Sequence, residues 1–142
     1  MGVDGDVNGD GDGDVLGKQL AAQPADSFVI MLSFQKLDVY RCAVEFLAFA
    51  FETSSLATRG NAPIMDQLKR AATSVPLNIA EAAGRTGNAD AARTYAIARG
   101  SAMECAAILD ALRTLEIIDA DRHRRGLELL ERIVAMLTRL CR

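Results

Sequence analysis

Residues 67–85 read QLKRAATSVPLNIAEAAGR, and this stretch decides the fold. Apolar side chains recur every three or four residues from just before this stretch, at Ile64, Leu68, Ala72, Val75 and Ile79. Polar side chains keep the same spacing, at Gln67, Arg70, Ser74, Asn78, Glu81 and Arg85. Pro63 suits a first helical position, and Gly84 is typical of a helix end. The pattern predicts an amphipathic helix over about residues 63–83.

One residue of this helix has an unfavourable helix propensity for its position. Pro76 lies in the interior, where it removes one backbone hydrogen bond and predicts a kink. We expect the side chain of Ser74 or Asn78 to satisfy the carbonyl that the kink frees near Ala72. Such a conflict between local preference and fold marks the segment for closer study.

Three more amphipathic helices are predicted, over about residues 34–57, 89–115 and 120–140. The first has apolar positions at Leu37, Tyr40, Val44, Leu47 and Phe51. Asn88 and Asp119 are expected to cap the last two helices. Each helix must bury its apolar stripe on a neighbour, and short connections favour antiparallel neighbours. We therefore predict an all-α, antiparallel up-down-up-down four-helix bundle over residues 34–142.

Composition and charge fit a single small domain. Of the 142 residues, 50% are hydrophobic but only 5% are aromatic, which favours packed helices over a β-sandwich. Residues 1–33 hold six acids and one base, a net charge of 1 − 6 = −5. Residues 34–142 hold 15 bases and 13 acids, a net of 15 − 13 = +2. This domain lacks the strongly basic character of a dedicated nucleic-acid binder.

Residues 1–33 are predicted to be a disordered acidic tail rich in Asp and Gly. Residues 6–11 are similar to the first half of a calcium-binding loop, but Gly17 stands where that loop needs a glutamate. A flexible tail is therefore favoured over a metal site. Met31 is a candidate alternative start, because the composition changes abruptly there.

The chain is expected to be cytoplasmic. Its N-terminus lacks the basic start of a signal peptide, and no apolar run reaches the ~20 residues that span a bilayer. Cys42, Cys105 and Cys141 have no metal-like spacing, so we interpret them as buried free thiols in a reducing compartment.

The third predicted helix contains a patch of small residues. Gly100 and Ser101 are expected to face the second helix, with Glu104 one turn further on. Arg70, Arg85 or Arg99 would then pair with Glu81 or Glu104. A structural polar seam and a seam that faces a partner are both compatible with this pattern.

The segment QLxRAxxSVPxNIAExxGR, followed by AxGSxxE, resembles the four-helix-bundle proteins encoded in intervening sequences of bacterial 23S rRNA genes. The same family includes the accessory variability proteins of diversity-generating retroelements, and the resemblance covers about residues 34–142. It implies a homopentameric bundle and, in the retroelement branch, binding of nucleic acid and a reverse transcriptase. The matching positions are Arg70, Ser74, Pro76, Asn78, Glu81, Gly84, Arg85, Gly100, Ser101 and Glu104. This chain lacks the strongly basic surface of the retroelement branch.

The sequence contains no recognisable catalytic set. Its only histidine, His123, excludes a ferritin-like di-iron centre and is expected on the surface. No cofactor, metal site or enzymatic activity is predicted.

The strongest basic patch surrounds that histidine. Candidate nucleic-acid contacts are Arg122, Arg124, Arg125, Lys69 and Arg85. Asp119, Asp121 and Glu128 lie close enough in sequence to neutralise part of the patch. We expect a homo-oligomer that binds RNA or DNA weakly. The alternative is a structural or protein-interaction scaffold with no nucleic-acid role.

Overall fold

The computed structural model describes residues 31–142. Most of the predicted acidic tail lies outside the described residues, and so do residues 6–11, which are similar to the first half of a calcium-binding loop. The described chain begins with a short 3-10 helix, η2 (Ser33–Lys36), followed by α2 (Asp38–Ser54). Three longer helices follow, α3 (Ala62–Ala83), α4 (Asn88–Thr114) and α5 (Ala120–Leu140). Within residues 31–142 the protein is all-α, with four α-helices and no strand.

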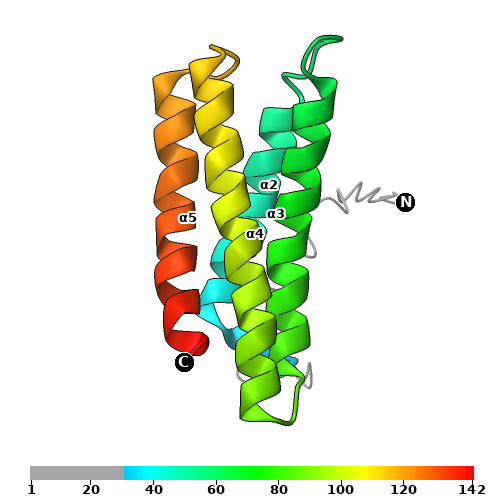
Figure 1. The fold of residues 1–142 in the computed structure, drawn as a ribbon, viewed down its shortest axis with the longest axis vertical. Coiled ribbons are helices and arrows are strands. Elements are labelled where there is room, and N and C mark those ends of the chain that lie inside the picture. Colours follow the sequence, from blue (N-terminus) through cyan, green and yellow to red (C-terminus); the bar gives the residue numbers. More distant parts are fainter. Residues whose placement is uncertain (1–30) are drawn as a thin grey trace, which may run out of the picture. The chain divides into compact units, whose positions relative to one another are not determined.

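The four α-helices lie side by side (Figure 1). α3 packs on α4, α4 packs on α5, and α2 packs on both α3 and α5. The turns from α2 to α3 and from α4 to α5 lie at the upper end of the view, and the turn from α3 to α4 lies at the lower end. Residues 32–142 form one unit around a shared core.

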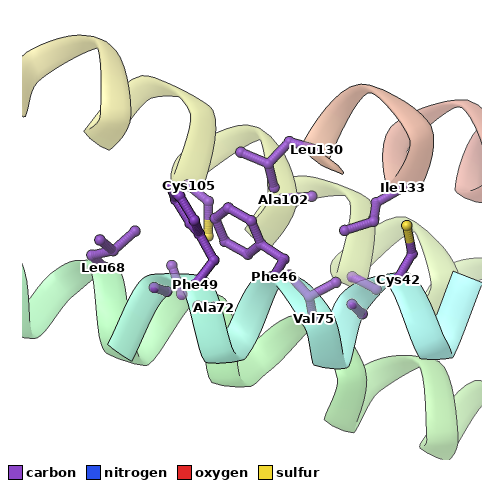
Figure 2. Packing of buried hydrophobic residues seen from close by; sticks show 14 of the residues in the cluster. Cys42, Phe46, Phe49, Leu68, Ala72, Val75, Ala102, Cys105, Leu130 and Ile133 are labelled. Carbon is purple, nitrogen blue, oxygen red and sulfur yellow. The ribbon is translucent and has the colours of Figure 1, made fainter. Parts of the chain in front are cut away.

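The core contains side chains from all four helices (Figure 2). Phe46, Leu68, Leu109 and Ile133 are each fully buried or nearly so, and together they represent the four helices. Burying a side chain of this size stabilises the fold by about 1.5–3 kcal/mol. No single helix holds this apolar surface on its own, so the helices depend on one another.

The predicted apolar stripe of the first helix is wrong. Phe51 is 51% exposed, and Leu37, Tyr40, Val44 and Leu47 are only partly buried. The buried positions of α2 are instead Val39, Cys42, Ala43, Phe46, Phe49, Ala50, Thr53 and Ser54. Residues 39–51 are apolar at most positions, so two stripes with helical spacing exist. Only packing against α3 and α5 selects between them.

The helix ends agree in part with the sequence. Asp119 caps α5, because its Oδ1 accepts from the Arg122 N–H at 2.8 Å. Gly84 ends α3, as predicted. Asn88 is not the cap of α4: it is the first helical residue, and Gly87 precedes it without a side-chain cap. The first helix begins later than predicted, because Leu37 is extended and separates η2 from α2.

Pro76 is buried inside α3, and the helix continues through it to Ala83. The nearby side chains do not act as predicted. Asn78 donates to the carbonyl of Ser74 at 2.8 Å, not to that of Ala72. The kink remains a prediction.

Candidate functional site

A polar network joins α3 to α4. The hydroxyls of Ser74 and Ser101 lie 2.8 Å apart, and the Asn78 amide donates to the Ser74 hydroxyl at 2.9 Å. All three side chains are half-buried. Because Asn78 also binds the Ser74 carbonyl, its amide is anchored twice within its own helix. Ser101 therefore faces the second predicted helix, as the sequence indicated.

Beside this network lies an open pocket of about 380 Å³. Its lining is formed by Gln67, Arg70, Ala71, Ser74, Ser101 and Glu104. Arg70 and Glu104 carry opposite charges on the two helices, but no ion pair joins them among residues 31–142. The pocket offers hydroxyl, amide, guanidinium and carboxylate groups for polar contacts. It has no histidine or cysteine that would serve as a base or nucleophile.

Gly100 does not face α3, which corrects the prediction. The residue is exposed, and a Cβ built on it would meet no atom within 4 Å. Successive helical residues are rotated by about 100°, so Gly100 and Ser101 cannot both face one neighbour. The bond from Ser101 to Ser74 assigns that role to Ser101 alone.

The predicted ion pairs between these helices form only in part. Arg85, in the turn after α3, pairs with Glu81 of α3 at 2.5 Å and reaches Asp90 of α4 at 3.6 Å. Arg99 points toward α5, where it donates to the hydroxyl of Thr138 at 3.4 Å. Arg85 thus links the end of α3 to the first turn of α4 from the turn between them.

Arg122, in the predicted basic patch, is packed into the bundle. Its side chain is only 21% exposed and donates to the buried Thr53 hydroxyl at 3.1 Å. It also lies 3.8 Å from the Glu52 carboxylate and 6.0 Å from the centre of the Phe49 ring. These contacts give Arg122 a structural role between α5 and α2.

The neighbours of Arg122 are paired with carboxylates. Arg124 bonds Asp121 and Glu128, and these bonds raise the pKa of its guanidinium. Arg125 lies 3.6 Å from Asp121. His123 contacts Asp110 of α4 at 2.8 Å. The patch is therefore largely neutralised by its own surroundings.

Lys69 is the remaining candidate contact for nucleic acid. It lies on α3, 3.4 Å from Asp66 and 6.0 Å from the centre of the Phe51 ring. It is therefore on a different helix from the patch at the start of α5. The five predicted basic contacts do not form one continuous cluster.

The model of the 23S rRNA-intervening sequence protein family matches residues 35–139. The chain belongs to this family. The match spans the four α-helices almost completely and includes the whole polar network between α3 and α4. No curated protein matches the chain. None of the helices described in residues 31–142 is long and apolar enough to cross a membrane.

The sequence did not predict a groove between α2 and α5 in this family member. Two adjoining hollows of about 480 and 440 Å³ share Glu45 and Arg132 in their linings. A signal was present: Asp38, Glu45 and Glu52 recur every seven residues on α2, and so do bases at 125, 132 and 139 on α5. Opposite charges with the same repeat are typical of two helices that lie side by side.

Two of the three cysteines have the predicted burial in the core, and Cys141 does not. Cys42 and Cys105 are buried, and Cys141 is half-buried. Burial raises the pKa of Cys105 to about 12 and also raises the pKa of Cys42. Both thiols are thus held in their unreactive neutral form at ordinary pH. In residues 31–142 no group of three or more ligating side chains is placed to hold a metal ion.

Proposed function

We propose that the protein is a non-enzymatic, homo-oligomeric binding protein of the cytoplasm. The observation that carries this proposal is the exposure of large apolar side chains on the outside of three helices. Phe51 of α2, Leu77 of α3, and Ile97 and Met103 of α4 are each more than half exposed. A small bundle gains by covering such surface with another copy of itself.

The topology that we propose for each subunit is antiparallel, up-down-up-down, with a kink at Pro76. Turns at alternate ends of the helices in Figure 1 support this arrangement. The resemblance implies that five copies assemble. Native mass spectrometry of the full chain at about 10 µM tests the assembly. We expect a mass of several 15.2 kDa chains, and a monomer alone would contradict the proposal.

Weak association with nucleic acid is the second part of the proposal. Arg70, Arg93, Arg132 and Arg139 are exposed and have no ion pair among residues 31–142. Free guanidinium groups suit phosphate contacts better than the paired arginines at the start of α5. With a domain charge of only +2, the affinity is expected to be low and dependent on salt.

Fluorescence anisotropy with labelled structured RNA and duplex DNA tests this part. We expect binding at low salt that weakens steeply toward physiological salt, because released counterions drive it. Changing Arg132 and Arg139 to Ala should reduce binding more than the same change at Arg124 and Arg125, which are paired with carboxylates. The second double variant is the matched control, because it removes the same charge from the surface of α5.

A protein-interaction scaffold without a nucleic-acid role is the alternative. It is favoured by the carboxylate partners of Arg122, Arg124 and Arg125. Absence of binding at low salt, where phosphate contacts are strongest, would leave this alternative in place.

A further inference from the structure

Two opposite sides of the bundle carry exposed apolar side chains. α2 and α4 each pack on both α3 and α5, so the side formed by α2 and α3 lies opposite the side formed by α4 and α5. At about 100° per residue, the outward positions of α2 and α3 on the first side fall within about 60° on each helix. We call them the Phe51 face, which consists of Tyr40, Val44, Leu47, Phe51, Arg70, Thr73 and Leu77.

A hollow of about 550 Å³ joins the two helices of this face into one surface. Its lining includes Phe51 of α2 together with Arg70 and Thr73 of α3. Phe51 is 51% exposed and Leu77 is 63% exposed. The stripe of α2 that is not buried in the core is therefore continued on α3 by Leu77, and the two form an apolar patch without a partner in the chain.

The side formed by α4 and α5 has a different shape. We call it the Met103 face, which consists of Ala96, Gly100, Met103, Ala107, Leu127, Glu131, Val134 and Thr138. These positions also fall within about 60° on each helix. Met103 is 58% exposed, and a Cβ built on Gly100 would meet nothing within 4 Å. One large apolar side chain thus stands among small residues of α4.

The hydrogen bond between Ser74 and Ser101 gives a common height along the bundle for α3 and α4. In the proposed antiparallel topology, Leu77 lies about 4.5 Å from this bond toward the turn between the two helices, at 1.5 Å per residue. Gly100 and Ala96 lie about 1.5 and 7.5 Å from it in the same direction. If two copies stand side by side at equal height, Leu77 of one therefore faces the gap between Gly100 and Ala96 of the next.

Met103 has a matching position on the other side of that bond. It lies about 3 Å toward the opposite end of the bundle, and Thr73 lies about 1.5 Å in the same direction. Met103 of the next copy therefore faces the hollow that Phe51 and Thr73 line. Contact of a methionine sulfur with an aromatic ring is favourable, and the contact covers apolar side chains that are exposed in the single chain.

Arg70 and Glu104 provide charge complementarity at one edge of this contact. Both are exposed, and neither has an ion pair among residues 31–142. They lie about 6 and 4.5 Å from the serine bond in the same direction, so Arg70 of one copy is level with Glu104 of the next. A phosphate backbone would be repelled by Glu104, which favours a second copy as the partner.

We propose that the Phe51 face of one copy binds the Met103 face of the next, head to tail. This inference rests on the proposed self-association and names its two surfaces. Because the faces differ, the contact repeats with a constant rotation, and a rotation of about 72° closes a ring at the five copies that the resemblance implies. Arg132 lines the groove between α2 and α5, outside both faces, so the contact leaves it open to nucleic acid.

Disulfide cross-linking tests the pairing of the two faces. In a full-length Cys141→Ser background, Leu77→Cys and Gly100→Cys should each remain monomeric on non-reducing gels, because each cysteine lies on one face only. An equimolar mixture, refolded together and oxidised, should give a dimer with one chain of each kind, since a disulfide requires Cα atoms within about 7 Å.

A mixture of Leu77→Cys with Ala135→Cys, which is exposed on α5 outside the Met103 face, is the matched control and should remain monomeric. Equal cross-linking in the control mixture, or in Leu77→Cys or Gly100→Cys alone, would overturn the proposal.

Charge reversal provides the second measurement. Arg70→Glu alone and Glu104→Arg alone should each raise the dissociation constant of the assembly about tenfold, and the double variant should restore it. Arg93→Glu, exposed on α4 outside both faces, is the matched control and should leave assembly unchanged. These residues are exposed, so circular dichroism should show that every variant folds.

The outcomes separate this contact from self-association in general. An oligomeric unmodified chain with no cross-link between Leu77→Cys and Gly100→Cys, and with no effect of charge reversal, would refute the contact and leave self-association intact. A monomeric unmodified chain would refute both proposals.

Discussion

Two glycines lie in the middle of helices, and they differ completely in their surroundings. At Gly126 of α5, an added Cβ would lie 2.5 Å from Leu109 Cδ1 and 2.7 Å from Phe49 Cε1. At Gly100 of α4, it would meet nothing within 4 Å. The first glycine is explained by close packing within the chain, and the second is not. A glycine inside a helix is therefore not by itself evidence of close packing within the chain.

The outer faces of the two helices show the same contrast. On α5 the exposed positions include the charged residues Arg124, Glu128, Glu131 and Arg132, which is typical of a solvent-exposed face. On α4 the corresponding side carries Ile97, Gly100 and Met103. Each experiment below changes one helix and compares the result with the other.

The largest effect is expected for Gly126→Val. Side-chain atoms would collide with Leu109 and Phe49, and overpacking of this kind costs about 1–3 kcal/mol. The free energy of unfolding from urea titration should fall by that amount. Gly100→Val at the same low protein concentration is the control and should be nearly neutral. Equal losses in the free energy of unfolding for the two variants would contradict the difference in packing between Gly126 and Gly100.

The next effect concerns the helix starts. Asp119→Ala removes the side chain that accepts from the Arg122 N–H, and loss of such a cap costs about 1 kcal/mol. Asn88→Ala should change the free energy of unfolding by less than about 0.5 kcal/mol, since Asn88 is no cap. Thermal melts of the two variants measure the difference. A larger loss for Asn88→Ala would reverse the assignment of caps.

Gly100→Ala should stabilise the subunit, in contrast to the preceding variants. In the isolated subunit the free energy of unfolding should rise by about 0.8–1.0 kcal/mol, because alanine is the better helix former and nothing obstructs its methyl group. Denaturation at nanomolar concentration, below the range of self-association, is the appropriate measurement. A decrease there would show that glycine is needed within the subunit itself.

The smallest effect is expected for Arg124→Gln on α5. The residue pairs with Asp121 and Glu128, but all three side chains are more than half exposed. Exposed pairs of this kind contribute about 0–1 kcal/mol and are screened by salt. The loss measured by urea titration should therefore be small and should shrink further at high salt. A large loss that does not depend on salt would mean that Arg124 is packed more tightly than its exposure indicates.

The sequence predicted the number of α-helices and several of their ends. Asp119 acts locally, through a side-chain oxygen that accepts from a backbone N–H three residues later, so its role can be recognised without the fold. The same holds for the contact of Ser101 with α3, which follows from small polar residues at matching positions.

The exposure of the predicted site residues depends on tertiary contacts, which helical periodicity does not reveal. Arg122 looked like part of an open basic patch, yet it packs on Phe49 and Thr53 across the bundle. Thr53 is 69 residues away along the chain, so periodicity within one helix could not reveal this contact. The groove between α2 and α5 was also missed, although opposite charges with the same seven-residue repeat indicate that these two helices lie side by side.

The sequence by itself determined that the chain forms amphipathic helices, because helical periodicity and end signals are properties of neighbouring residues. Only the tertiary structure decided which stripe of α2 is buried and which side of α4 remains open. Residues 39–51 offer two apolar stripes, and burial of Phe46 instead of Phe51 depends on where α3 and α5 lie. The same packing leaves Gly100 exposed, because Ser101 takes the position toward α3.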